Sequence, residues 1–171
     1  ELHTAKSQQA LIVSRLGTKG RPEWVKTFEN ADPTLLDADV AADGSMLVGG
    51  FYKSSLPDIG TAWHGTPPAE ESGLTFGLLS LEPNGTVRWG HAIDVAPQDV
   101  WGQSFRVRVE SNGEATIIDD MLLFDDDETS EESQEDSEPI HLIRRITSSG
   151  QELWNRPFLC PACDIDRMDV H

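Results

Sequence analysis

The sequence predicts an all-β fold made of antiparallel β-hairpins that recur along the chain. Gly-x-x-x-Trp units repeat at a spacing of 65 residues, and stretches rich in β-branched and aromatic residues flank each unit. A Gly-containing turn between two such stretches is typical of a β-hairpin. Since one repeat cannot bury its apolar face alone, we expect neighbouring repeats to pack on one another. The repeat positions are Gly20 and Trp24, Gly85 and Trp89, and Gly150 and Trp154.

The first hairpin of each repeat contains the Gly-x-x-x-Trp unit. In the first repeat we expect a strand at 10–16, a turn at 17–20 and a returning strand at 22–28. Residues 75–93 and 140–158 have the same order, and their turns also end in Gly. Glycine suits such turns because it adopts positive φ without steric cost. Apolar residues match across the copies at Leu16, Leu81 and Ile146, and at Phe28, Ile93 and Phe158.

A second hairpin follows the first in the first two repeats. Residues 38–48 turn at Asp-Gly, and residues 105–118 turn at Asn-Gly. Apolar and charged residues alternate from 105 to 110, which is the period of a strand with one buried face. The unit is therefore two hairpins, or four strands in about 65 residues, and we expect four-stranded antiparallel blades.

The repeats divide the chain into segments, and the third repeat is expected to be incomplete. Val170 follows Trp154 by sixteen residues, as Val40 follows Trp24, just before a strand that would need another hairpin. About two and a half repeats are thus expected, in a fragment or one segment of a longer protein. The expected segments are an N-terminal extension at 1–9, repeat 1 at 10–53, a Pro- and Gly-rich loop at 54–73, repeat 2 at 74–124, an acidic disordered insertion at 125–138 and repeat 3 at 139–171.

The charge of the chain is concentrated in one segment. The net charge is −17, and eleven acidic residues, with no Lys or Arg, lie between Asp119 and Glu138. Removing these eleven leaves −6. Binding of nucleic acid needs clustered Lys and Arg, so we expect no nucleic-acid partner. No run approaches the roughly 20 apolar residues of a transmembrane helix, so we expect no membrane span.

The repeats resemble those of bacterial β-propellers. LIVSRLGTKGRPEWVKTF and ADVAADGSMLVGGFY resemble SBBP-type repeats, with an apolar strand, a polar turn with Gly, then Trp, and an Asp-Gly hairpin that ends in Gly and an aromatic residue. LLSLEPNGTVRW is similar to the repeat of pyrroloquinoline-quinone-like propellers. The resemblance covers 10–52, 74–121 and 140–171, and it implies propeller blades in a secreted or surface protein.

The three Trp residues of the repeats have two interpretations. A large side chain at one position of every repeat favours packing between adjacent sheets, where the indole N–H can find a backbone partner. The alternative is a set of rings that stack on a ligand. We favour the packing role for Trp24, Trp89 and Trp154.

Cys160 and Cys163 form a Cys-Pro-Ala-Cys motif in a connection between two predicted hairpins. The spacing fits a thioredoxin-like redox pair, but no helix pattern follows that would lower a thiol pKa. Half of a zinc site completed by His141 or His171 is a second alternative, and free thiols are a third. We favour a local disulfide that pins the loop, which is consistent with an extracellular or periplasmic protein.

The sequence shows no dedicated catalytic or metal motif. Aspartates after the Trp strands could place oxygen ligands for calcium on one face, but they lack the spacing of a dedicated calcium loop. These weak metal candidates are Asp37, Asp39, Asp164 and Asp166. We expect no catalytic residues and no resident cofactor, with calcium as the one cofactor left open.

The expected function is a non-enzymatic extracellular, cell-surface or periplasmic module that acts as a scaffold or protein-interaction surface. Its partners would be other chains or the remaining blades of the same protein, which would cover exposed sheet edges. The alternative is a fragment of a quinone-dependent dehydrogenase-type propeller enzyme, which would need a quinone and a calcium site.

Overall fold

The computed structural model describes residues 10–29, 31, 33–52, 56–64, 74–95, 105–121 and 140–159. These residues form β-strands with one short 3-10 helix, η1 (Gly60–Ala62). The predicted all-β character and the antiparallel hairpins are confirmed. Within the same ranges, no helix is long and apolar enough to cross a membrane.

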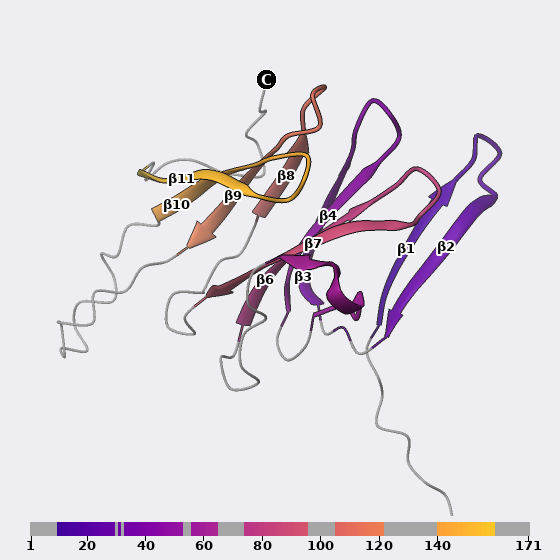
Figure 1. The fold of residues 1–171 in the computed structure, drawn as a ribbon, viewed down its shortest axis with the longest axis horizontal. Helices are drawn as coiled ribbons and strands as arrows, with labels where there is room; N and C mark the ends of the chain where they lie inside the picture. Colours follow the sequence, from indigo (N-terminus) through magenta and orange to yellow (C-terminus); the bar gives the residue numbers. More distant parts are fainter. Residues whose placement is uncertain are drawn as a thin grey trace, which may run out of the picture.

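The described strands form three sheets that stand side by side (Figure 1). A two-stranded sheet pairs β1 (Ala10–Leu16) with β2 (Pro22–Glu29). A five-stranded sheet has the order β3 (Pro33–Val40), β4 (Met46–Tyr52), β6 (Leu74–Leu81), β7 (Val87–Val95) and β5 (Trp63–His64). A four-stranded sheet has the order β8 (Phe105–Val109), β9 (Ala115–Met121), β10 (Ile140–Ile146) and β11 (Glu152–Leu159).

Each larger sheet joins the second hairpin of one repeat to the first hairpin of the next. In the five-stranded sheet β4 pairs with β6, and in the four-stranded sheet β9 pairs with β10, both antiparallel. The two hairpins of a single repeat therefore lie in different sheets. The sequence repeat predicts where the strands lie along the chain. Which strand edges pair with one another depends on contacts between segments that are distant in the sequence.

The five hairpin turns share one backbone geometry, and each requires glycine at its last position. In the first turn Gly17 N–H donates to the Arg21 carbonyl and Gly20 N–H donates to the Gly17 carbonyl, and the other four turns repeat this pair of bonds. The terminal glycines have φ between +70° and +87°, where a Cβ would be strained. These glycines are Gly20, Gly44, Gly85, Gly113 and Gly150.

Two hydrophobic cores fill the spaces between the sheets. The first lies between β1–β2 and the five-stranded sheet and includes Leu11, Phe28, Val48 and Leu79. The second lies between the five- and four-stranded sheets and is built from Leu47, Phe51, Phe76, Leu78, Trp89, Val107, Ala115, Ile117 and Ile146. The five-stranded sheet is thus covered on both faces, which explains why β4 and β6 are apolar along most of their length.

Candidate functional site

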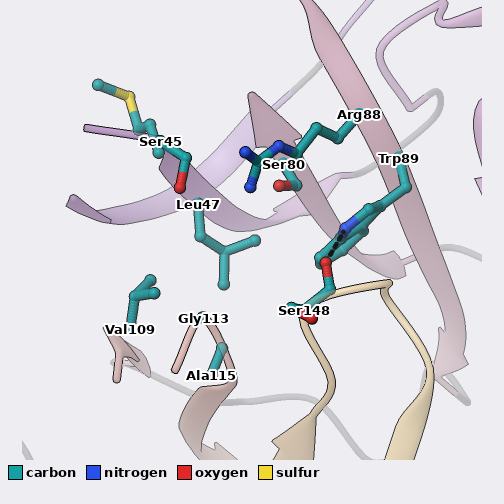
Figure 2. Close-up of a pocket in the computed structure, with 10 residues that line it drawn as sticks. Ser45, Leu47, Ser80, Arg88, Trp89, Val109, Gly113, Ala115 and Ser148 are labelled. Atoms are coloured by element: carbon teal, nitrogen blue, oxygen red, sulfur yellow. Dashed lines mark hydrogen bonds between the residues drawn. The ribbon is translucent and has the colours of Figure 1, made fainter. Parts of the chain in front are cut away.

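Each Trp of the first two repeats lies on the glycine turn of the next repeat. Trp89 on β7 is 6% exposed, and its Nε1–H donates to the Ser148 carbonyl at 2.9 Å. A Cβ built on Gly150 would lie 2.7 Å from the Trp89 ring, so the ring rests on a turn with no side chain at that point. Figure 2 shows Trp89 against this turn. We call such a contact a Trp–Gly junction.

Trp24 forms the same junction one repeat earlier. Its Nε1–H donates to the Pro83 carbonyl at 2.8 Å, and a Cβ on Gly85 would lie 2.9 Å from its ring. Both acceptor carbonyls belong to the residue two positions before the turn glycine. The structure therefore places Trp24 and Trp89 between sheets, in the arrangement that packing requires.

The cavity beside the second junction is too small for an organic ligand. It has a volume of about 20 Å³ and is lined by Ser45, Leu47, Ser80, Trp89 and Ala115 among others (Figure 2). A space of this size holds about one water molecule. The buried indole of Trp89 is thus a structural contact and has no free face for stacking.

Arginine side chains make polar contacts beside the Trp positions of the first and third repeats. Arg15 donates to the Pro83 carbonyl at 3.2 Å, the same oxygen that Trp24 uses. Arg145 stands opposite Trp154 in the register and binds Glu110, Glu114 and Thr116. Hydrogen bonds from Arg145 hold the pKa of the Glu114 carboxyl below its usual range. These contacts order the hairpin turns at one end of the sheets.

Asp37 and Asp39 bind the edge strand of the neighbouring sheet. The Oδ2 atom of Asp37 accepts the Val107 N–H at 2.8 Å, and the Oδ2 atom of Asp39 accepts the Val109 N–H at 2.9 Å. Both donors belong to β8, which is the edge strand of the four-stranded sheet. The two carboxylates therefore satisfy backbone donors at this sheet edge, a role that the sequence reasoning missed. The signal in the sequence was a pair of aspartates at alternate positions, 37 and 39, at the start of the predicted second hairpin.

The metal hypothesis gains no support from the described residues. They contain no group of three or more His, Cys, Asp or Glu side chains that could hold a metal ion. One carboxylate oxygen of Asp37 and one of Asp39 already accept backbone hydrogen bonds from β8. Asp164 and Asp166 lie outside the described residues, as do Cys160, Cys163 and His171, so the calcium, zinc and disulfide hypotheses at these positions stay predictions.

His91 lies on the covered face of β7, two residues after Trp89. Its Nδ1 atom is buried, and among the described residues it has no hydrogen-bond partner. Burial lowers the pKa of the imidazole, while Glu152 opposes this shift and His64 and Arg144 add to it. Arg144 and Glu152 form an ion pair at 3.2 Å. The group combines a partly buried histidine of β7 with an ion pair of the four-stranded sheet.

The outermost sheets expose apolar side chains at both ends of the described structure. On β11, Trp154 is 41% exposed, and Leu153, which points to the opposite side of the strand, is 51% exposed. On β1 and β2, the exposed large residues are Ile12, Leu16 and Val25. An open groove of about 430 Å³ runs between β1 and β3–β4, with Leu11, Ile12, Leu36, Ala38 and Val48 in its lining. These surfaces are the candidate interaction sites of the chain.

No family model matches the chain, and the search of curated proteins finds no match.

Proposed function

We propose that this chain is a non-enzymatic protein-interaction module built of propeller-type blades. The observation that carries the proposal is the third Trp of the repeat. Trp24 and Trp89 form Trp–Gly junctions inside the chain, whereas Trp154 occupies the same position with its ring exposed. Aromatic side chains are enriched in protein-binding surfaces, and Trp154 is such a side chain, exposed on the outer sheet.

The strand order supports the blade assignment. β3-β4-β6-β7 and β8-β9-β10-β11 are consecutive antiparallel sets of four strands, and each set packs face to face on its neighbour. Propellers repeat such four-stranded sheets around an axis. The two strands β1 and β2 correspond to β6–β7 and β10–β11, so they form the outer half of a further blade.

The proposed location is extracellular, cell-surface or periplasmic. The resemblance to secreted propeller repeats and the proposed Cys160–Cys163 disulfide support it. Mass spectrometry of the purified chain with and without a reductant tests the disulfide. We expect a mass increase of two hydrogens after reduction, and equal masses would remove this support.

The first experiment asks whether the chain carries enzyme chemistry. The purified chain is denatured, and the supernatant is analysed for quinone absorbance and for calcium by elemental mass spectrometry. The chain is also assayed for alcohol-dependent dye reduction after addition of pyrroloquinoline quinone and calcium. We expect neither a stoichiometric quinone nor dye reduction. Either result would overturn the non-enzymatic proposal and favour a dehydrogenase-type enzyme.

The second experiment asks whether the chain works within an assembly. Native mass spectrometry of the chain isolated from its own source under mild conditions should give a complex heavier than the chain's 18.8 kDa. A species of that mass alone, at every concentration, would contradict the interaction role.

A further inference from the structure

We propose that Trp154 of one copy docks on the Gly20 turn of a second copy, so that the chain associates head to tail. This inference rests on the proposed interaction role and names its partner as a second copy of the same chain. It would repeat between two molecules the Trp–Gly junction that each molecule forms twice within itself.

One end of the molecule carries the unused Trp. Trp154 faces Arg145 across the β10–β11 pair, as Trp24 faces Arg15 across the β1–β2 pair. Trp154 is 41% exposed as a residue, with the Arg156 guanidinium 5.7 Å from its ring centroid. Within the described part of the chain, no hydrogen bond from its indole N–H is seen. Trp154 thus has the position of a junction Trp, and none of the glycine turns in the described ranges lies under it.

The other end carries the unused turn. Gly20 has φ +70° and the same pair of backbone bonds as the turns that receive Trp24 and Trp89. No described atom lies within 4 Å of the position of a Cβ on Gly20. Thr18 stands two residues before Gly20, as Pro83 and Ser148 do before their turn glycines. Its carbonyl is therefore the expected acceptor for the Trp154 indole of the second copy.

The outer face of the β1–β2 sheet carries exposed apolar side chains. One of them stands at a repeat position that is buried in the other two sheets. Leu16 on β1 is 61% exposed, whereas Leu81, its equivalent on β6, is 0% exposed beneath the neighbouring sheet. Ile12 and Val25 are also exposed on this face of the hairpin. The same transformation that stacks the sheets inside the chain would bring the β10–β11 face of a second copy onto these side chains.

A second copy is the occupant because one chain carries both halves of the missing junction. Trp154 is exposed at one end, and the Gly20 turn has no described atom within 4 Å of its Cβ position at the other.

Such an interface is heterologous, since its two sides are different surfaces. Head-to-tail contacts of this kind close into rings or continue as filaments. They also allow a complementation test. A chain with a defective Trp end still offers its Gly20 turn, and a chain with a blocked turn still offers Trp154.

The test uses the full 171-residue chain and two single variants. Trp154→Ala removes the docking ring. Gly20→Asn places a Cβ where the ring should lie, while asparagine still tolerates positive φ. Sedimentation velocity is recorded for each chain over a dilution series from about 100 to about 1 μM. Leu153→Ala is the matched control, because Leu153 is exposed next to Trp154 but points to the opposite side of β11.

We expect concentration-dependent oligomers of the wild-type chain and of Leu153→Ala. Trp154→Ala and Gly20→Asn should each weaken self-association at least tenfold, with unchanged circular dichroism. An equimolar mixture of the two variants should form one-to-one dimers and nothing larger, because each has one working end.

Three results would overturn the inference. They are a wild-type chain that stays monomeric at all concentrations, oligomers that persist in both variants, and a variant mixture that stays monomeric while the wild type associates. These failures would leave the proposed function standing if the chain isolated from its source is found with other proteins. Conversely, a bound quinone would overturn that function without touching self-association.

Discussion

Trp89 and Trp154 occupy the same position of consecutive repeats but lie in opposite environments. Trp89 is 6% exposed and bonded to Ser148, whereas Trp154 is 41% exposed. The strands that carry them have similar sequences and the same type of turn. The difference therefore comes from the neighbouring sheet, which covers the first Trp and not the second. The two turn glycines differ in the same way. Gly150 lies against the Trp89 ring, whereas no described atom lies within 4 Å of the Cβ position of Gly20.

The largest effect on stability should come from removing the Trp89 ring, and removal of the Trp154 ring provides the comparison. Trp89→Ala should lower the free energy of unfolding by about 3–5 kcal/mol, because it opens a cavity in the core between the sheets. Trp154→Ala should change it by at most about 0.5 kcal/mol in dilute solution. Chemical denaturation followed by circular dichroism measures both. Equal losses would show that the two environments do not differ as described.

The turn glycines provide the reciprocal test. Gly150→Ala should cost about 2–5 kcal/mol, since it adds strain at φ +87° to a clash with the Trp89 ring. Gly20→Ala should cost only the strain, about 1–2 kcal/mol. Thermal unfolding of the two variants, measured where the chain is monomeric, gives the comparison. A Gly20 variant as unstable as the Gly150 variant would mean that an unseen contact covers the first turn.

The β3–β8 contact should contribute less than the junction. Asp37→Ala leaves the Val107 N–H without its acceptor and should cost about 1–3 kcal/mol. Asp37→Asn retains an acceptor oxygen and should recover most of that loss. Asp58→Ala is the control, since Asp58 accepts an exposed local hydrogen bond from Gly60. If Asp37→Asn is as unstable as Asp37→Ala, the carboxylate charge matters more than the hydrogen bond.

The smallest effect should be a pH dependence from His91. Burial holds the pKa of His91 below its ordinary value of 6.5, so the unfolded chain binds a proton first as the pH falls. Stability should therefore decrease as the pH is lowered from neutrality through about 6.5, until the folded His91 is also protonated. Glu152, Arg144 and His64 act on this group, and His91→Gln should flatten the pH dependence. An unchanged slope in His91→Gln would show that His91 does not cause the pH dependence.

The local structure was predictable because it depends on short-range sterics. The hairpins at 10–28, 75–93 and 140–158 follow from apolar runs on either side of a glycine turn, and the structure shows positive φ at Gly20, Gly85 and Gly150. The Gly-x-x-x-Trp period also indicated a packing role for the indole. A backbone that needs positive φ selects glycine whatever lies around it.

The partners of these elements were not predictable in the same way. The repeat suggested that two hairpins of one unit share a sheet, but β4 pairs with β6 across the repeat boundary. Asp37 and Asp39 were considered as metal ligands, and they instead accept backbone bonds from β8, some 70 residues away. A sequence pattern cannot identify a hydrogen-bond partner at that separation when several edges have the same N–H groups to offer.

The sequence by itself determined the hairpins, the turn glycines and the period of the Trp positions, because these depend on backbone sterics and on the alternation of apolar residues. Only the tertiary structure decided which hairpins share a sheet, which carboxylate meets which strand edge and which Trp is covered. Those outcomes depend on burial between segments that are distant in the chain. That burial distinguishes Trp89 from Trp154 although their local sequences are similar.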